Sequence, residues 1–81
     1  MTEITDRQLE VLSFIEKFRV KNGYAPSVEE MAEELKVEST FSIRKHIKAL
    51  QAKALLNHVA GQQRNVFATP LGHKILLEHS L

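Results

Sequence analysis

The apolar residues of the first quarter of the chain recur at helical intervals. The positions that share one side of this helix are Leu9, Val11, Leu12, Phe14, Ile15 and Phe18. Such a stripe is typical of an amphipathic helix. Thr5 and Gln8 have the spacing of a capping box, and Asn22 followed by Gly23 favours a left-handed stop. We therefore expect a helix over about residues 6–21.

Two further helical segments follow, separated by a short turn. Ser27 and Glu30 form a second capping-box pattern, which opens a helix over about Val28–Lys36. Ser39 is placed to cap a third helix that runs to about Lys53. The apolar side of this third helix consists of Ile43, Ile47 and Leu50. A short helix, a tight turn and a longer helix are typical of a helix-turn-helix.

From Leu55 onward the apolar period changes from helical to strand-like. Leu55–Val59 and Asn65–Ala68 flank the polar segment Gly61–Arg64, which predicts a β-hairpin. Thr69-Pro70 supplies an N-cap and a proline at the first position of a last helix, which runs to about His79. The predicted fold is mainly α with a small β-hairpin: a winged helix-turn-helix of three helices, a two-stranded wing and a closing C-terminal helix.

Length and composition limit the architecture and the compartment. Eighty-one residues predict a single domain over residues 1–81, and 43% apolar content with three Gly and two Pro predicts a globular chain. The absence of cysteine excludes disulfides and thiolate metal sites. The charged N-terminus does not resemble a signal peptide, and the short apolar runs cannot span a membrane. We expect a cytoplasmic protein that associates with the nucleoid when it binds DNA.

The net charge of +1 hides an uneven distribution. Residues 1–38 contain nine acidic and five basic residues, for −4, whereas residues 39–81 contain one acidic and six basic residues, for +5. An acidic half and a basic half suggest a surface that meets a polyanion. The alternative is an uneven surface that faces only solvent.

The polar side of the third helix carries the candidate contacts to DNA. Arg44, Lys45 and Lys48 lie on it; Arg is well shaped to contact guanine, whereas Lys more often meets phosphate. Ser39 could combine capping with a phosphate contact. Thr40, Phe41 and Ser42 occupy the first turn of the helix. The Phe41 ring has three open interpretations: contact with thymine methyl groups, a patch for a protein partner, or an additional core residue.

Polar residues outside the third helix add weaker candidates. Gln62, Gln63 and Arg64 stand at the expected tip of the hairpin, where a wing could reach the adjacent groove or backbone. Lys53, at the end of the third helix, is a candidate phosphate contact.

Several segments match one family in register. They are Thr5-x-Arg7-Gln8-x-Glu10-Val11, Asn22-Gly23-Tyr24-x-Pro26-Ser27, Glu30-x-Ala32-x-x-Leu35, Ser39, and His46-Ile47-Lys48-Ala49-Leu50. On these segments, over roughly residues 4 to 60, the chain resembles the N-terminal DNA-binding domain of the LexA-type repressors. The resemblance implies a winged helix-turn-helix regulator of bacterial or phage type, with double-stranded DNA as its partner. It also implies that the start of the third helix contacts the DNA.

The departures from the family pattern are specific. Lys36 and Ala54 stand where the family commonly has Gly. If these positions are left-handed, each side chain costs on the order of 1 kcal/mol. Thr40, Phe41 and Ser42, in the first turn of the third helix, also differ from the usual residues of the family. The family's operator sequence is therefore not expected to apply. The 81 residues contain no match to the self-cleaving peptidase domain of the family, so we expect neither its Ser–Lys chemistry nor its dimer interface in them.

Nothing in the sequence indicates catalysis or a cofactor. The four histidines, His46, His58, His73 and His79, show no i, i+4 pair and no carboxylate spacing typical of a metal site. No glycine-rich phosphate loop, nucleophile elbow or metalloprotease motif is present. We expect neither an enzyme nor a small-molecule ligand.

The leading hypothesis is a sequence-specific DNA-binding transcriptional regulator, most simply a repressor, that reads the major groove with the helix at about 40–53. One module buries little area on DNA, so a homodimer is expected, with the apolar C-terminal helix (Leu71, Ile75, Leu76 and Leu77) as a candidate surface. That helix could instead only close the core. The alternatives are a winged-helix protein-interaction module, favoured by the acidic second helix and by Phe41, or the excised DNA-binding domain of a longer regulator.

Overall fold

Four helices and a two-stranded sheet make up the part of the chain that the structure describes. The structure is a computed structural model, and it describes residues 4–58 and 66–79. The elements in chain order are α1 (Asp6–Asn22), α2 (Val28–Glu34), α3 (Thr40–Ala52), β1 (Leu56–His58), β2 (Val66–Ala68) and α4 (Pro70–His79). This is the predicted winged helix-turn-helix, and all six elements are present within one or two residues of their expected bounds.

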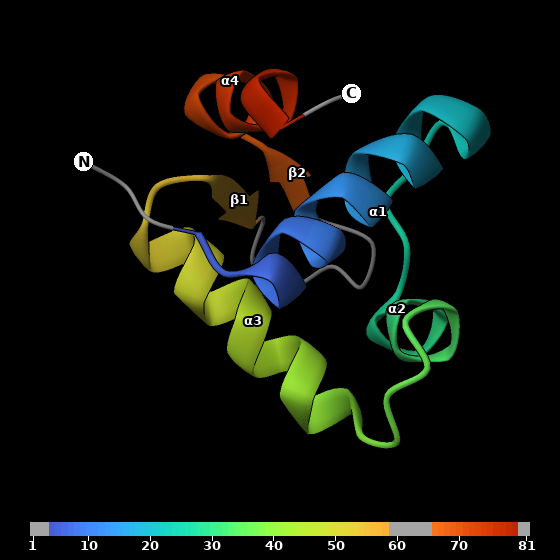
Figure 1. The fold of residues 1–81 in the computed structure, drawn as a ribbon. Helices are drawn as coiled ribbons and strands as arrows, with labels where there is room; N and C mark the ends of the chain where they lie inside the picture. The colour runs from blue at the N-terminus through green and yellow to red at the C-terminus, as the bar shows by residue number, and fades with distance from the viewer. Residues whose placement is uncertain (1–3, 59–65, 80–81) are drawn as a thin grey trace.

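Helix α1 is the central element of the fold. It packs against α2 and α3 on one side and against β2 and α4 on the other. Figure 1 shows α3 at the bottom of the molecule, with α2 near its N-terminal end. Helix α4 lies at the top, above the two strands. Of the described elements, α1, α2 and β1 pack on α3, and none of them covers the long side of this helix that faces away from the core.

The core lies where α1, α3 and the hairpin meet. Its fully buried or nearly buried members are Val11, Leu12, Ile15, Ala25, Met31, Ala32, Ile43, Ile47, Leu50, Leu55, Leu56, Val66, Ala68 and Ile75. Every element contributes to this cluster. At about 25 cal/mol per Å² of apolar surface removed from water, it supplies the main driving force for folding.

The buried face of α1 is rotated from the expected stripe. Leu9, Phe14 and Phe18 are only partly buried, whereas Gln8 and Glu16 are 9% and 8% exposed. Gln8 is inward because its side chain serves the predicted capping box. Its backbone N–H donates to Thr5 Oγ1 over 3.1 Å, and its Oε1 accepts from the Thr5 N–H over 3.3 Å. The stripe therefore includes two polar residues that hydropathy alone assigns to solvent.

Helix α2 ends at Glu34, two residues earlier than expected, because Lys36 is left-handed with φ 57°. The N–H of Val37 donates to Ala32 O over 3.0 Å, and that of Lys36 donates to Glu33 O over 3.3 Å. This pair of bonds is a Schellman motif, in which glycine usually takes the left-handed position.

Helix α3 ends in the same way at Ala54, which has φ 60°. The N–H of Leu55 donates to Leu50 O over 2.9 Å, and that of Ala54 donates to Gln51 O over 3.0 Å. Positions 36 and 54 are thus both left-handed, which is the condition under which each side chain costs on the order of 1 kcal/mol. Both helices therefore end with a side chain in a conformation that favours glycine.

Restoring glycine at these two ends is expected to stabilise the domain. Lys36→Gly and Ala54→Gly should each raise the free energy of unfolding by about 0.5–1 kcal/mol, because the relieved strain exceeds the added entropy of the unfolded chain. Urea denaturation would measure the change. Lys36→Ala is the control, since it removes the side chain but keeps the strain. Equal stability of the Gly and Ala variants at position 36 would contradict the explanation.

Helix α4 is joined closely to the end of α3. Thr69 Oγ1 accepts from the Gly72 N–H over 3.0 Å and donates to Ala54 O over 2.7 Å, so the predicted cap also links two elements. A Cβ at Gly72 would overlap the carbonyl oxygen of Leu55. Glycine at position 72 thus allows α4 to approach the backbone that follows α3.

The two strands form the predicted antiparallel hairpin. Leu56 pairs with Ala68, Asn57 with Phe67 and His58 with Val66. Leu56, Val66 and Ala68 are buried against the helices. The expected wing tip, Gln62, Gln63 and Arg64, lies outside the described residues.

Candidate nucleic-acid interface

Helix α3 has one buried face and one exposed face. Ile43, Ile47 and Leu50 are buried. Four exposed residues form a continuous row on the other side, at intervals of three, four and seven: Phe41, Arg44, Lys45 and Lys48. We call this row the α3 stripe. Its members share one side of the helix because these spacings match the 3.6-residue helical period.

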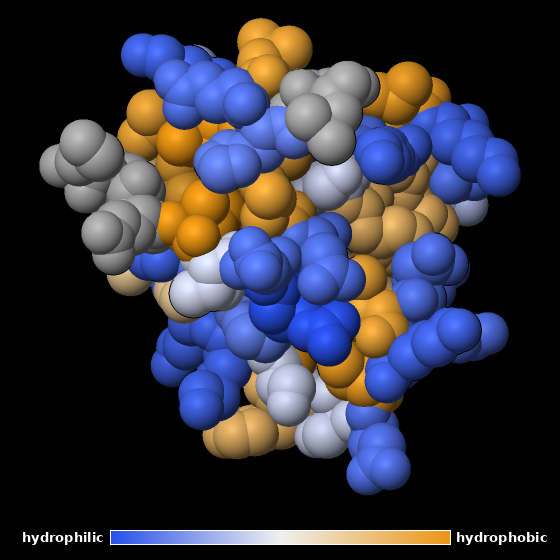
Figure 2. Space-filling view, viewed as in Figure 1, coloured by the Kyte–Doolittle hydropathy of each residue, from blue (hydrophilic) through white to orange (hydrophobic). Residues whose placement is uncertain are grey.

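The α3 stripe contains three cations and no acid. In Figure 2, hydrophilic residues dominate the surface over α3. In the described residues, no ion pair joins Arg44, Lys45 or Lys48 to a carboxylate. Thirteen residues make a helix about 20 Å long, which suits the major groove of DNA.

The N-terminus of α3 carries a side-chain cap. Ser39 Oγ accepts the N–H of Phe41 over 3.1 Å, which confirms the expected cap. Ser39 is exposed, whereas Thr40 and Ser42 are partly buried. Amide hydrogens and a hydroxyl at a helix N-terminus suit an anion such as phosphate.

Lys53 also contributes to the fold. Its Nζ lies 2.7 Å from Gln8 Oε1, the atom that also closes the capping box of α1. The side chain is partly buried and joins the end of α3 to the start of α1. This hydrogen bond gives Lys53 a structural role. The phosphate contact expected for Lys53 stays a prediction.

His46 lies beside the α3 stripe, on the side that approaches α1. The pKa of His46 is lowered from its ordinary value of 6.5, first by burial and then by the positive charges of Arg7 and Lys45. Arg7 is held in place because its Nη1 lies 3.3 Å from Leu35 O and 3.5 Å from Glu10 Oε2. The neutral imidazole is thus the form that the folded domain favours.

This lowered pKa predicts a loss of stability in acid. The unfolded chain binds a proton at His46 more readily than the folded domain. The contribution of His46 is therefore fully favourable above pH 6.5 and is lost as the pH falls through 6.5 towards the lower pKa of the folded state. His46→Gln should reduce the difference in the free energy of unfolding between pH 7.5 and pH 5, measured by urea denaturation. An identical pH dependence in both proteins would contradict this account.

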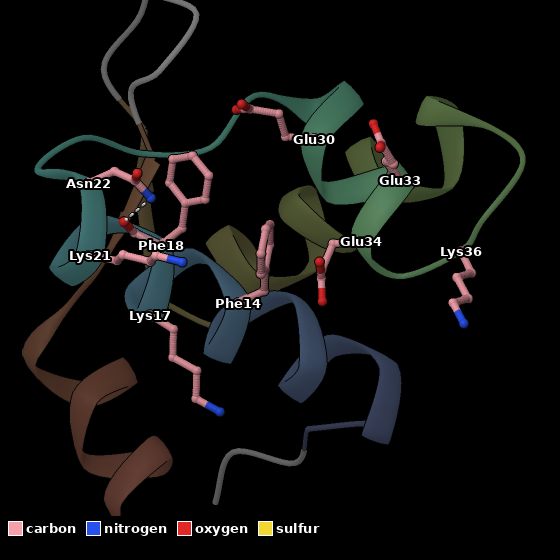
Figure 3. Close-up of a pocket in the computed structure, with 9 residues that line it drawn as sticks. All are labelled: Phe14, Lys17, Phe18, Lys21, Asn22, Glu30, Glu33, Glu34 and Lys36. Carbon is pink, nitrogen blue, oxygen red and sulfur yellow. Dashed lines mark hydrogen bonds between the residues drawn. The ribbon is translucent and has the colours of Figure 1, made fainter.

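The acidic residues of α2 do not all have the same role. Glu30 completes a capping box, since its Oε1 accepts the N–H of Ser27 over 2.8 Å. Glu33 and Glu34 line a groove of about 680 Å³ between α1 and α2, across from Lys17 and Lys21. Figure 3 shows Phe14 and Phe18 of α1 in the same groove. These two glutamates thus line the α1–α2 groove, to which the α3 stripe contributes no residue.

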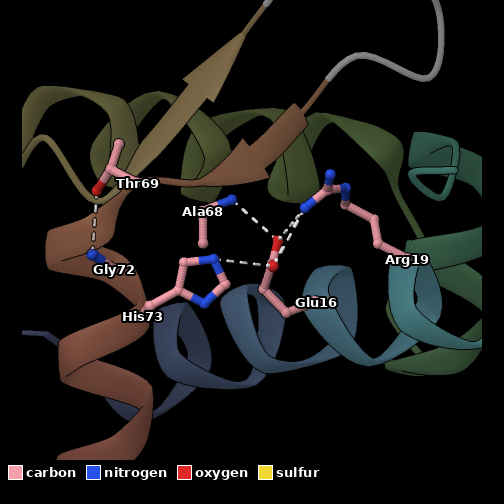
Figure 4. Close-up of polar contacts among 6 residues, drawn as sticks. All are labelled: Glu16, Arg19, Ala68, Thr69, Gly72 and His73. Carbon is pink, nitrogen blue, oxygen red and sulfur yellow. Dashed lines mark hydrogen bonds and ion pairs between the residues drawn. The ribbon is translucent and has the colours of Figure 1, made fainter. Parts of the chain in front are cut away.

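Glu16 is a buried polar residue that the sequence analysis missed. Its Oε2 accepts the N–H of Ala68 over 2.9 Å, and Arg19 Nη1 and His73 Nε2 lie 3.2 and 3.4 Å from its Oε1. Figure 4 shows this carboxylate joining α1, β2 and α4. The Arg19 guanidinium also lies over the Phe67 ring, 5.5 Å from its centroid. All these contacts are structural, and they hold the hairpin and α4 on α1.

Neither a metal centre nor a membrane span is indicated by the described residues. Residues 4–58 and 66–79 contain no group of three potential His, Asp or Glu ligands. Within the same ranges, no helix is long and apolar enough to cross a bilayer.

Comparison with known proteins identifies close relatives. The family model described as LexA DNA binding domain matches residues 1–65. The LexA repressor of Anaeromyxobacter sp. (strain Fw109-5) is 40% identical over 76 residues, covering 94% of this chain and 33% of the relative. The LexA repressor of Myxococcus xanthus (strain DK1622) is 38% identical over 76 residues, which cover 94% of this chain and 34% of the relative. This chain thus spans about a third of the length of these relatives.

A solved structure shares the fold. The crystal structure of T. acidophilum IdeR superposes with a TM-score of 0.72 at 20% identity, over 94% of this chain and 33% of that one. The likeness at this identity concerns the arrangement of helices and hairpin.

Proposed function

Because the chain belongs to the LexA DNA-binding domain family, we propose that it binds double-stranded DNA in a sequence-specific manner and acts as a transcriptional repressor. The observation that carries the proposal is the α3 stripe, a row of one phenyl ring and three cations that have no ion-pair partner among residues 4–58 and 66–79. The role is that of a binding module, without catalysis of its own.

In the proposed complex, α3 enters the major groove with the α3 stripe towards the base edges. Arg44 contacts a guanine, while Lys45 and Lys48 neutralise flanking phosphates. Ser39, Thr40 and Ser42 approach the backbone where α3 begins, and Lys53 does so where it ends. Gln62, Gln63 and Arg64 are proposed to contact DNA from the wing. Occupancy of the site then excludes polymerase.

A second copy of the chain is proposed to complete the complex. One module buries only about 600–1,000 Å² on DNA, so two copies on a two-fold site would give useful affinity. Ile75 is buried and closes the core, whereas Leu71 and Leu77 are 39% and 76% exposed. Helix α4 thus closes the core with one side and offers the other side as a dimer surface.

The rival proposal is a protein-interaction module. The exposed glutamates of α2 and the exposed Phe41 ring favour it. The uncovered row of cations on α3 favours DNA. Because the relatives are about three times as long, this chain is also consistent with the DNA-binding part of a longer regulator.

The salt dependence of binding tests the proposed function. Fluorescence anisotropy would give the Kd for a mixed-sequence duplex at several salt concentrations. We expect a linear fall of log K with log salt, with a slope of about −0.9 for each neutralised phosphate. Absence of binding even at low salt would favour the protein-interaction module.

A further inference from the structure

Phe41 is an exposed aromatic residue inside a row of cations. Its side chain is 67% exposed, which excludes the interpretation of an additional core residue. Among residues 4–58 and 66–79, the other large exposed hydrophobic residues lie on α4 and near the end of α1: Val20, Tyr24, Leu71 and Leu77. On α3 the neighbours of Phe41 at i+3, i+4 and i+7 are Arg44, Lys45 and Lys48. The ring therefore stands in the surface that we propose to face DNA.

The surroundings of Phe41 favour DNA over a protein partner. A protein-docking patch is usually a contiguous apolar area. On α3 the exposed residues that follow the ring along its own face are the cations Arg44, Lys45 and Lys48, and then the small Ala52 at the end of the helix. In the major groove, the apolar group on a base edge is the C5-methyl group of thymine. In the proposed complex Arg44 contacts guanine, and Lys45 and Lys48 contact phosphates. The Phe41 ring enters the groove beside them, where the thymine methyl group is its apolar partner.

We propose that Phe41 is a specificity-determining residue that packs on the C5-methyl group of a thymine in the recognised site. The inference rests on the proposed function. Phe41 and Arg44 are separated by about 4.5 Å along the helix axis, and base pairs are stacked about 3.4 Å apart. The thymine is therefore expected within one or two base pairs of the position that Arg44 contacts.

Replacing thymine by deoxyuridine tests this contact, because the exchange removes the methyl group and keeps the Watson–Crick edge. Each thymine of the selected site would be replaced in turn, and the Kd measured by anisotropy. At one position the wild-type protein should lose about three- to fivefold in affinity, the value of one buried methyl group. Phe41→Ala should bind the thymine duplex about as weakly as the wild-type protein binds the uracil duplex. Its own affinity should not fall further when uracil replaces thymine.

Two controls accompany the exchange. Val20→Ala removes another exposed hydrophobic residue, 87% exposed on α1, and should leave the uracil effect unchanged. Phe41→Leu keeps an apolar side chain and should retain part of the effect. Thermal unfolding of each variant confirms that it is folded, which is expected because Phe41 lies outside the core.

The outcomes separate this inference from the proposed function. If the wild-type protein binds its site and no uracil exchange weakens it, the inference is overturned while DNA binding stands. The same holds if Phe41→Ala keeps the full uracil effect, since another residue then contacts the methyl group. If the wild-type protein binds no duplex, both proposals fail together.

Discussion

Replacing Glu16 by Ala is expected to lower the free energy of unfolding by about 2–4 kcal/mol, which would be the largest effect on stability predicted here. The substitution removes the acceptor of the buried Ala68 N–H and the anion that Arg19 and His73 face. An unsatisfied buried N–H costs about 1–3 kcal/mol, and loss of the partly buried Arg19–Glu16 ion pair adds about 1 kcal/mol. Part of the ion-pair contribution is discounted because Arg19 and His73 are partly exposed to solvent.

Two comparisons separate the contributions of Glu16 in urea denaturation. Glu16→Gln keeps an oxygen for the Ala68 N–H and loses only the charge, so it should recover about half of the loss caused by Glu16→Ala. Glu10→Ala removes the partner of Arg7 in an exposed pair of the same i, i+3 geometry and should cost less than about 1 kcal/mol. Equal losses at positions 10 and 16 would show that the buried contacts with β2 and α4 contribute nothing.

Replacing Arg44 and Lys45 by Ala is expected to produce the largest loss of DNA affinity. A guanine-contacting arginine is worth about 1–3 kcal/mol, so its removal alone should weaken binding roughly 5- to 150-fold. Removal of the lysine should reduce the salt slope by about one. Both side chains are exposed, so the domain is expected to stay folded. Anisotropy titrations at several salt concentrations measure both quantities.

The matched control for this variant is Lys17→Ala with Lys21→Ala. These lysines are exposed on α1 and line the groove beside α2, and their removal changes the net charge by the same amount. We expect their salt slope to equal that of the wild-type protein. If both double variants lose affinity equally, binding depends on net charge, and the α3 stripe has no special role.

The sequence predicted those parts of the fold that neighbouring residues encode. The capping boxes at Thr5 and Ser27 predicted the starts of α1 and α2, because cap and partner are three residues apart. The buried face of α3 followed from its apolar period. Glu16 was missed because its partner Ala68 is 52 residues away, and no local pattern distinguishes it from a solvent-facing glutamate. The contact between Lys53 and Gln8 was missed for the same reason.

The sequence predicted which residues of α3 are exposed, whereas their contacts with DNA stay a prediction. Helical spacing was enough to place Phe41, Arg44, Lys45 and Lys48 together, and the structure shows all four exposed on one side of α3. The resemblance singled out Lys36 and Ala54 as replacements of a common glycine, and only the structure shows that both are left-handed. The recognised base sequence depends on how α3 is oriented in the groove, which is a property of the complex.

Selection from a randomised duplex library at two salt concentrations tests the central claim most directly, with the wild-type protein beside the Arg44→Ala, Lys45→Ala variant. We expect the wild-type protein to enrich one motif, with two-fold symmetry if two copies bind, and the variant to lose it. Enrichment of the same motif by both proteins, or by neither, would contradict the claim that the exposed face of α3 reads DNA.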